Sequence, residues 1–113
     1  MNSRGERAEA LAAEFLGSRG LTITGRNYRC RFGEIDLIAR DGDTLVFVEV
    51  RSRSVSSYGG AAASITAGKR EKLLKTARHY LAGVRNQPPC RFDAVLLTGT
   101  PPRIEWIRNA FGD

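Results

Sequence analysis

The 113-residue chain has only two cysteines, one histidine and no long apolar run. Cys30 and Cys90 are too few and too far apart for a zinc knuckle or a disulfide framework, so we expect reduced thiols. The first ten residues are polar where a secretory signal would be apolar, and no segment approaches the roughly 20 apolar residues that cross a bilayer. These absences favour a cytoplasmic protein that makes no membrane contact. His79, the single histidine, has no partner visible in the sequence, and we expect it to be structural.

Acidic residues are also in deficit, with 12 Asp and Glu against 18 Lys and Arg, which gives a net charge of +6. A basic surface attracts polyanions, of which nucleic acid is the commonest. Hydrophobic residues at 42% and charged residues at 27% are ordinary for a globular protein and argue against a disordered or fibrous chain. The length suits one domain over residues 1–113.

Hydrophobic periodicity predicts two helices and several strands. Apolar residues at helical spacing predict a helix from Ser3 to about Gly20 and a second, cationic helix from Thr66 to Val84. Strands are expected at 21–24, 34–40, 44–51, 91–98 and 103–107, with an irregular basic stretch at 26–33 and a loop at 52–64. Both faces of the two central strands are apolar, which favours an α/β fold with helices on both sides of the sheet.

The segment Asp41-Gly42-Asp43 predicts a tight hairpin between the two central strands. If the turn has two residues, Asp36 shares a face with Phe47, Glu49 and Arg51; a three-residue loop would separate them. The same alternation divides the apolar residues into two faces. Ile35, Leu37, Val46, Val48 and Val50 are expected on one face, and Ile38, Leu45 and Phe47 on the other.

Carboxylates are costly inside apolar strands, yet Asp36 and Glu49 both lie in one. On a shared face their Cβ atoms would be roughly 5 to 8 Å apart, a separation that one divalent cation can bridge. Oxygen ligands of this kind suit Mg²⁺ or Mn²⁺ better than zinc. Arg51 would project beside them and hold a phosphate oxygen. Spacing alone leaves open a second interpretation, a structural ion-pair cluster at a strand end.

The central block GEIDLIARDGDTLVFVEVR, with RNYR before it and YGGAAASIT after it, resembles the YraN family of bacterial proteins. That family is a branch of the restriction-endonuclease-like PD-(D/E)xK superfamily, related to archaeal Holliday-junction resolvases. The likeness extends from the AExxAxxxLxxxG pattern of the first helix through RFDAVLL to IEWIRNAF. It implies a restriction-endonuclease-like αβββαβ core, in which helices flank a mixed sheet of four to five strands.

The resemblance also assigns roles to four residues. Asp36 would be the first metal-binding aspartate and Glu49 the second acidic ligand, while Glu9 matches an acidic residue that resolvase-like members add to the metal site. Glu9 has an alternative interpretation as a solvated glutamate in the first turn of a helix. Arg51 stands where the superfamily motif has its lysine. A lysine can help to activate water, whereas a guanidinium stays charged and only orients or stabilises.

These implications lead to a metal-dependent endonuclease that hydrolyses phosphodiester bonds in DNA, including branched or structured DNA. The cofactor would be Mg²⁺ or Mn²⁺, which lowers the pKa of a water and polarises the scissile phosphate while Arg51 stabilises the added charge. Two alternatives stay open. One is a catalytically silent nucleic-acid-binding protein with the same fold, and the other is a small protein whose basic face binds an acidic partner.

Six basic residues flank the expected site in sequence and are predicted to contact phosphates without reading bases. They are Arg26, Arg29, Arg31, Arg53, Lys69 and Arg70. Tyr28 and Tyr58 are candidates for stacking on unpaired bases, although core or rim positions are the more common role of an aromatic residue. Related nucleases that cut two strands often form homodimers, and the sequence neither shows nor excludes one here.

Overall fold

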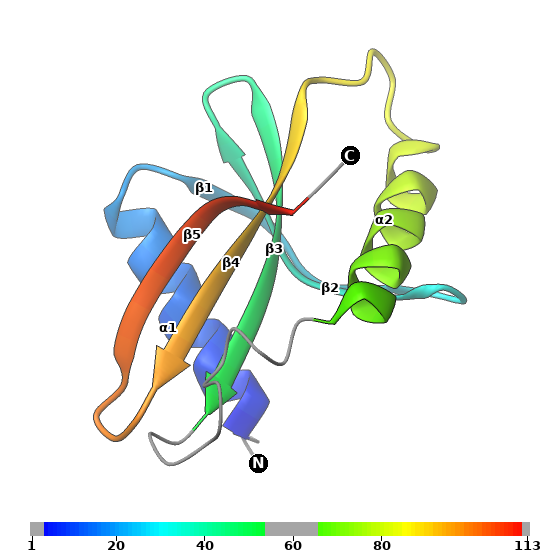
Figure 1. Cartoon of the computed structure of the whole chain (residues 1–113). Coiled ribbons are helices and arrows are strands. Elements are labelled where there is room, and N and C mark those ends of the chain that lie inside the picture. Colours follow the sequence, from blue (N-terminus) through cyan, green and yellow to red (C-terminus); the bar gives the residue numbers. More distant parts are fainter. Residues whose placement is uncertain (1–3, 54–65, 112–113) are drawn as a thin grey trace.

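The protein folds into a five-stranded sheet with one helix on each face (Figure 1). The computed structural model describes residues 4–53 and 66–111. The elements in chain order are α1 (Arg4–Ser18), β1 (Thr22–Cys30), β2 (Gly33–Asp41), β3 (Thr44–Arg53), α2 (Ala67–Leu81), β4 (Cys90–Thr98) and β5 (Arg103–Phe111). The strands are ordered β1-β2-β3-β4-β5. This arrangement confirms the α/β class and matches a restriction-endonuclease-like αβββαβ core, followed by one further strand.

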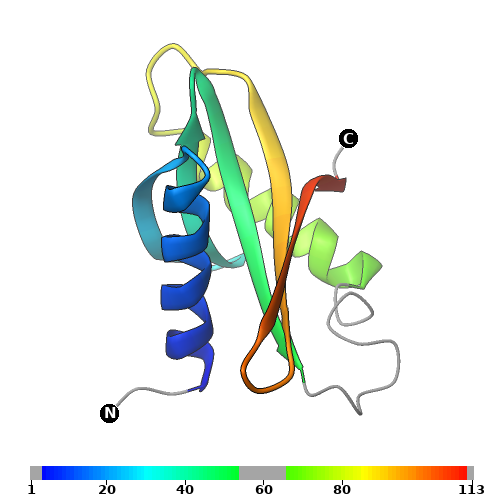
Figure 2. The ribbon, with the colours of Figure 1, turned by 90° about the vertical axis from the view of Figure 1, so that its left-hand side faces the viewer.

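The sheet is mixed because β3 and β4 run parallel while every other neighbouring pair is antiparallel. Parallel neighbours need a crossover connection, and α2 lies in that connection. Figure 2 shows α1 on one side of the sheet and α2 on the other. Each helix covers its own core. The α1 side packs Ala12 and Leu16 against Val46 and Val48, and the α2 side packs Leu73 and Ala77 against Phe47 and Leu96.

The β2–β3 hairpin closes with the predicted two-residue turn. Asp41 pairs with Thr44, and the ladder continues to Leu37 opposite Val48. Gly42 has a φ of +61°, a left-handed conformation that glycine adopts without the steric penalty of a side chain. The register therefore puts Asp36 and Glu49 just beyond the last pair of the β2–β3 ladder.

The basic stretch after residue 24 is a strand, so the prediction of an irregular segment at 26–33 was wrong. β1 continues to Cys30 by pairing with β2. Its irregularity is confined to a register shift between Ile23 and Gly25 and to Asn27, which has a φ of +52°. Asparagine tolerates this conformation better than most residues. Pairing with a neighbouring strand outweighed the local signals of Gly25 and Asn27.

The expected faces of the hairpin are correct except at Ile35. Leu37 packs on the α1 side as predicted, but Ile35 packs on the α2 side together with Ile38. The alternation of β2 therefore breaks at Asp36. At that point the ladder with β3 has ended, and the Asp36 side chain accepts a hydrogen bond from the Val50 backbone N–H of β3.

Other element boundaries differ by a few residues from the predictions. α2 ends at Leu81 instead of Val84, because the chain turns there with a hydrogen bond from the Gly83 N–H to the Tyr80 carbonyl. β5 runs four residues past the expected 107, to Phe111. Ser3 and most of the predicted loop lie outside the described residues. Within the described part of the chain, neither helix is long and apolar enough to cross a membrane.

Candidate metal and nucleic-acid site

Asp36 is held at the point where the β2–β3 ladder ends. Its side chain is nearly buried, with 8% exposed, and its Oδ2 accepts a hydrogen bond of 2.8 Å from the Val50 backbone N–H. An antiparallel ladder would satisfy that N–H with a carbonyl of the facing strand. The carboxylate takes the place of that carbonyl, so Asp36 lies in line with the sheet and is accessible from both of its faces.

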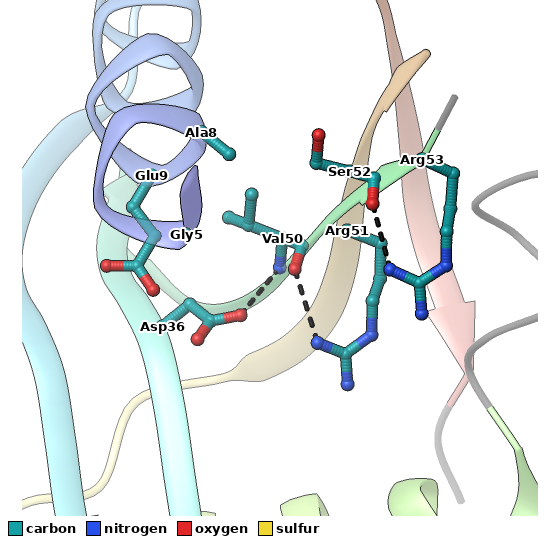
Figure 3. Close-up of a pocket in the computed structure, with 8 residues that line it drawn as sticks. All are labelled: Gly5, Ala8, Glu9, Asp36, Val50, Arg51, Ser52 and Arg53. Atoms are coloured by element: carbon teal, nitrogen blue, oxygen red, sulfur yellow. Dashed lines mark hydrogen bonds between the residues drawn. The ribbon is translucent and has the colours of Figure 1, made fainter. Parts of the chain in front are cut away.

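Glu9 approaches Asp36 from the α1 side. Figure 3 shows the two carboxylates next to each other between α1 and β2. Burial, followed by the charge of Asp36 and a hydrogen bond with it, raises the pKa of Glu9 to about 7, and a hydrogen bond from Asn27 opposes the rise. The helix position that the resemblance singled out therefore does lie beside the first acidic residue.

Glu49 approaches Asp36 from the α2 side and is 5% exposed. Burial raises the pKa of Glu49 to about 9, with further contributions from a hydrogen bond with Asp36 and from its charge. The positive charges of Arg51 and Lys69 act in the opposite direction and are outweighed. Burial and the neighbouring Asp36 therefore disfavour the ionised form of Glu49, which a bound cation would favour.

Arg51 lies beside the two acidic residues, as predicted. Its Nη2 forms an ion pair with Glu49, and its Nη1 donates to the Val50 carbonyl at 3.4 Å. Its Nε is buried, and among residues 4–53 and 66–111 it has no hydrogen-bond partner. A buried donor without an acceptor is unfavourable, so the hydrogen bonds of the Arg51 guanidinium are incompletely satisfied within the described residues.

Two pockets open onto this group, one on each face of the sheet. The α1-side pocket is lined by Ala8, Glu9, Asp36, Val50, Arg51 and Arg53 (Figure 3). The α2-side pocket is lined by Gly33, Asp36, Glu49, Arg51, Lys69 and Lys72. Asp36 and Arg51 belong to both pockets, and the α2-side pocket sets two lysines of α2 opposite the acidic pair.

The predicted phosphate contacts are spread around these pockets. Arg53 lines the α1-side pocket and Lys69 the α2-side pocket, while Arg70 lies exposed on α2. Arg26 and Arg29 line a third pocket along β1 that shares Glu9, and Arg29 forms an exposed ion pair with Glu34. Arg31 lies in the turn between β1 and β2. Each of the six is at least partly exposed.

Of the two tyrosines that were candidates for base stacking, the structure describes Tyr28. Tyr28 is half-buried, its hydroxyl lies 2.6 Å from His79 Nδ1, and its ring packs edge-on against Tyr80. This hydrogen bond agrees with a structural role for His79. Tyr58 lies outside the described residues.

Sequence reasoning missed two residues near the site, Lys72 and Phe32. Lys72 follows Lys69 by three residues in α2, and this spacing places both on one face of a helix, so the signal was present. Phe32 had no periodic signal, because it lies in the tight turn between Cys30 and Gly33.

As the side chains stand in the described part of the chain, no group of three or more His, Cys, Asp or Glu residues is arranged to hold a metal ion. The donor set that the structure offers is therefore the pair of carboxylates on β2 and β3. Glu9 lines the α1-side pocket together with Asp36. Mg²⁺ is commonly bound by one or two protein carboxylates together with substrate phosphates and water, so a pair is a sufficient donor set.

Comparison with known sequences agrees with this architecture. The family model described as "Uncharacterised protein family UPF0102" matches residues 8–97. A UPF0102 protein from Nitrosomonas europaea is 61% identical over 112 residues, which cover 98% of this chain and 95% of the relative. UPF0102 proteins from Nitrosospira multiformis and Methylobacillus flagellatus are 59% and 55% identical, over 96% and 98% of this chain and 92% and 98% of theirs. The chain therefore belongs to the UPF0102 family, which is the YraN family that its central block resembles.

Proposed function

We propose that this protein is a metal-dependent endonuclease that hydrolyses phosphodiester bonds in DNA. The observation that supports the proposal best is the convergence of Asp36 and Glu49 beside Arg51, in a pocket whose opposite wall carries Lys69 and Lys72. Acidic groups that hold a cation, next to basic groups that hold phosphate, are what phosphoryl chemistry requires. The kinship with junction resolvases favours branched or structured DNA as the substrate.

The residues fit a hard divalent cation such as Mg²⁺ or Mn²⁺. Asp36 and Glu49 are both less than a tenth exposed, and each lies within the field of the other, so a cation between them would replace repulsion by attraction. When bound, such an ion lowers the pKa of a water and polarises a phosphate oxygen. Glu9, which lines the α1-side pocket together with Asp36, would hold a water beside the ion.

The chain's own residues supply positioning and charge. Lys69 and Lys72 bring the DNA backbone to the α2-side pocket, and the partly exposed guanidinium of Arg51 donates to an oxygen of the scissile phosphate. Because a guanidinium stays protonated, Arg51 stabilises developing negative charge and does not take up a proton. Proton transfer from the attacking water would then fall to a carboxylate of the site.

The second candidate function is DNA binding without cleavage, and one observation favours it. The ion pair between Arg51 and Glu49 already neutralises the second acidic residue of the pair. A cation must displace that guanidinium to reach Glu49. If the ion pair persists, the acidic pair remains an internal structural contact, and the basic surface alone carries the function.

Metal binding separates the two candidates. We expect calorimetry to show one site for Mn²⁺ in the wild-type protein, and loss of that site in Asp36→Ala and Glu49→Gln. Glu14→Gln is the matched control, since Glu14 is an exposed carboxylate on α1 that lines none of the three pockets described above. Absence of Mn²⁺ binding up to millimolar concentrations in the wild type would contradict the nuclease proposal.

Cleavage is then tested on labelled single-stranded, duplex, flap and four-way DNA with Mg²⁺ or Mn²⁺. We expect product with the wild type and Glu14→Gln, and none with Glu49→Gln, which also controls for a contaminating nuclease. Equal cleavage by wild type and Glu49→Gln would assign the activity to a contaminant. Binding to DNA in the absence of any cleavage would support the silent alternative.

A further inference from the structure

Phe32 is an exposed aromatic residue at the tip of the β1–β2 hairpin. Among the residues that the structure describes, it is the only large hydrophobic side chain classed as exposed, with 36% of its surface accessible. The turn around it is short, because Cys30 pairs with Gly33 and leaves only Arg31 and Phe32 between the strands. An apolar ring is rarely placed at a solvent-exposed turn, where polar residues and glycine are favoured.

The ring is held in place instead of being mobile at the end of a loop. The Phe32 N–H donates to Cys30 Sγ at 3.4 Å, and the ring lies edge-on to His79, with centroids 6.1 Å apart. The turn packs closely against α2 at Gly33, because a Cβ added to Gly33 would lie only 3.1 Å from Thr76 Oγ1. A ring with fixed orientation loses little conformational entropy when it contacts a ligand.

Positive charge lies beside the ring. The Arg31 guanidinium lies over it, 4.9 Å from the centroid, and Lys72 lines the same pocket as the neighbouring Gly33. Aromatic rings combined with cations are the usual elements of a surface that stacks the bases of single-stranded nucleic acid and follows its phosphates. A site for an apolar protein partner would instead place further hydrophobic residues around the ring.

The ring is also continuous with the candidate site. Gly33, its neighbour in the chain, lines the α2-side pocket together with Asp36 and Glu49. Asp36 lies four positions after Phe32 in the chain, which corresponds to about 13 Å in an extended strand. That distance equals about four steps of a base-stacked strand.

We infer that Phe32 stacks on an unpaired base of the nucleic acid whose phosphate enters the α2-side pocket. The inference rests on the proposed function, because it places the same substrate at both positions. Only an unpaired base or a strand end presents a free face, since bases inside a duplex are covered on both sides. Phe32 therefore selects substrates with unpaired nucleotides a few steps from the phosphate that is cut.

The test compares three variants of Phe32 in the full-length protein. Phe32→Ala removes the ring, Phe32→Leu keeps an apolar side chain without an aromatic face, and Phe32→Trp keeps an aromatic ring. Binding is measured by fluorescence anisotropy in EDTA, where no cleavage occurs, with two probes of about twenty nucleotides. One is an oligothymidine, and the other is a duplex closed at both ends by non-nucleotide linkers, which has neither an unpaired base nor a free strand end.

We expect Phe32→Ala and Phe32→Leu to weaken oligothymidine binding roughly tenfold and to change duplex binding less than about twofold. Phe32→Trp should bind oligothymidine as the wild type does, and its added indole should be quenched on binding. The wild type contains a single tryptophan, Trp106, which provides the background signal. Equal losses on both probes, or wild-type binding of oligothymidine by Phe32→Ala and Phe32→Leu, would overturn the inference.

The outcome is separable from that of the proposed function. If Mn²⁺ binding and cleavage fail while Phe32→Ala loses oligothymidine binding selectively, the stacking role stands and the nuclease proposal falls. If cleavage is established and Phe32→Ala binds oligothymidine normally, the stacking role alone is refuted. Circular dichroism at increasing temperature shows whether each variant folds as the wild type does. Phe32→Trp and Phe32→Leu are the decisive pair if the alanine variant is unstable.

Discussion

Replacing Glu49 by glutamine should stabilise the metal-free protein at neutral pH while removing its response to metal. Glu49 is 5% exposed, and burial together with Asp36 raises its pKa to about 9. In the unfolded chain the same group titrates near its ordinary value of 4.5. Above that value the unfolded state releases a proton that the folded state keeps, so folding stability falls as the pH rises from about 4.5 towards 9.

The size of this effect follows from the linkage between protonation and folding. Each pH unit within that window corresponds to about 1.4 kcal/mol, so between about pH 5 and pH 7 the loss is at most about 3 kcal/mol. Glutamine does not titrate and retains most of the volume. It cannot form the ion pair that an ionised Glu49 makes with Arg51, which offsets part of the gain. We therefore expect Glu49→Gln to be more stable than wild type by about 1 to 2 kcal/mol near pH 7.

The assay is urea unfolding in EDTA at several values from about pH 5 to pH 8, with Glu14→Gln as the control. The difference between wild type and Glu49→Gln should widen as the pH rises, and Glu14→Gln should follow the wild type. Saturating Mn²⁺ should then stabilise the wild type and leave Glu49→Gln unchanged. A difference that is constant across this pH range would refute the argument from burial of the charge.

Three further predictions concern the framework around the site. Asp36→Ala leaves the buried Val50 N–H without its acceptor and should destabilise the protein by about 1 to 3 kcal/mol in urea, whereas Asp36→Asn should recover most of that loss. Gly42→Ala should destabilise the protein by about 1 kcal/mol and so lower its melting temperature, because Gly42 has a φ of +61°. Gly17→Ala should raise the melting temperature slightly, because Gly17 lies inside α1 with open space around it. Asp93 is fully buried and accepts hydrogen bonds from Arg91, Trp106 and Asn109. Asp93→Ala should therefore destabilise the protein by about 3 kcal/mol or more in thermal unfolding. A loss below about 1 kcal/mol would contradict that account.

The parts of the fold that were predictable from the sequence are those set by local chemistry. The Asp41-Gly42 step fixed the turn and hence the register, and the register placed Glu49 and Arg51 on the expected face. β1 was predicted too short because Gly25 and Asn27 look like breakers, and only pairing with β2 shows that the strand continues. Long-range pairing of this kind has no signature within a short window of sequence.

The candidate site was likewise predictable from the sequence only in part. Asp36 and Glu49 were identifiable because charge inside apolar strands stands out, while Glu9 entered through the family resemblance alone. The role of Asp36 as acceptor for the Val50 N–H was not predictable, because it depends on where the ladder ends. The same break moved Ile35 to the other face, against the alternation rule.

The parallel pairing of β3 and β4 has a consequence for how this protein can change over evolution. A return segment is obligatory between such strands, and here it contains α2, whose outward cations are Lys69, Arg70, Lys72, Lys75 and Arg78. The acidic residues come instead from β2, β3 and α1. If the proposed function holds, much of the affinity for a polyanion is thus encoded in a different stretch of the chain from the acidic residues. Mutations on the helix surface can retune the first and leave the second intact.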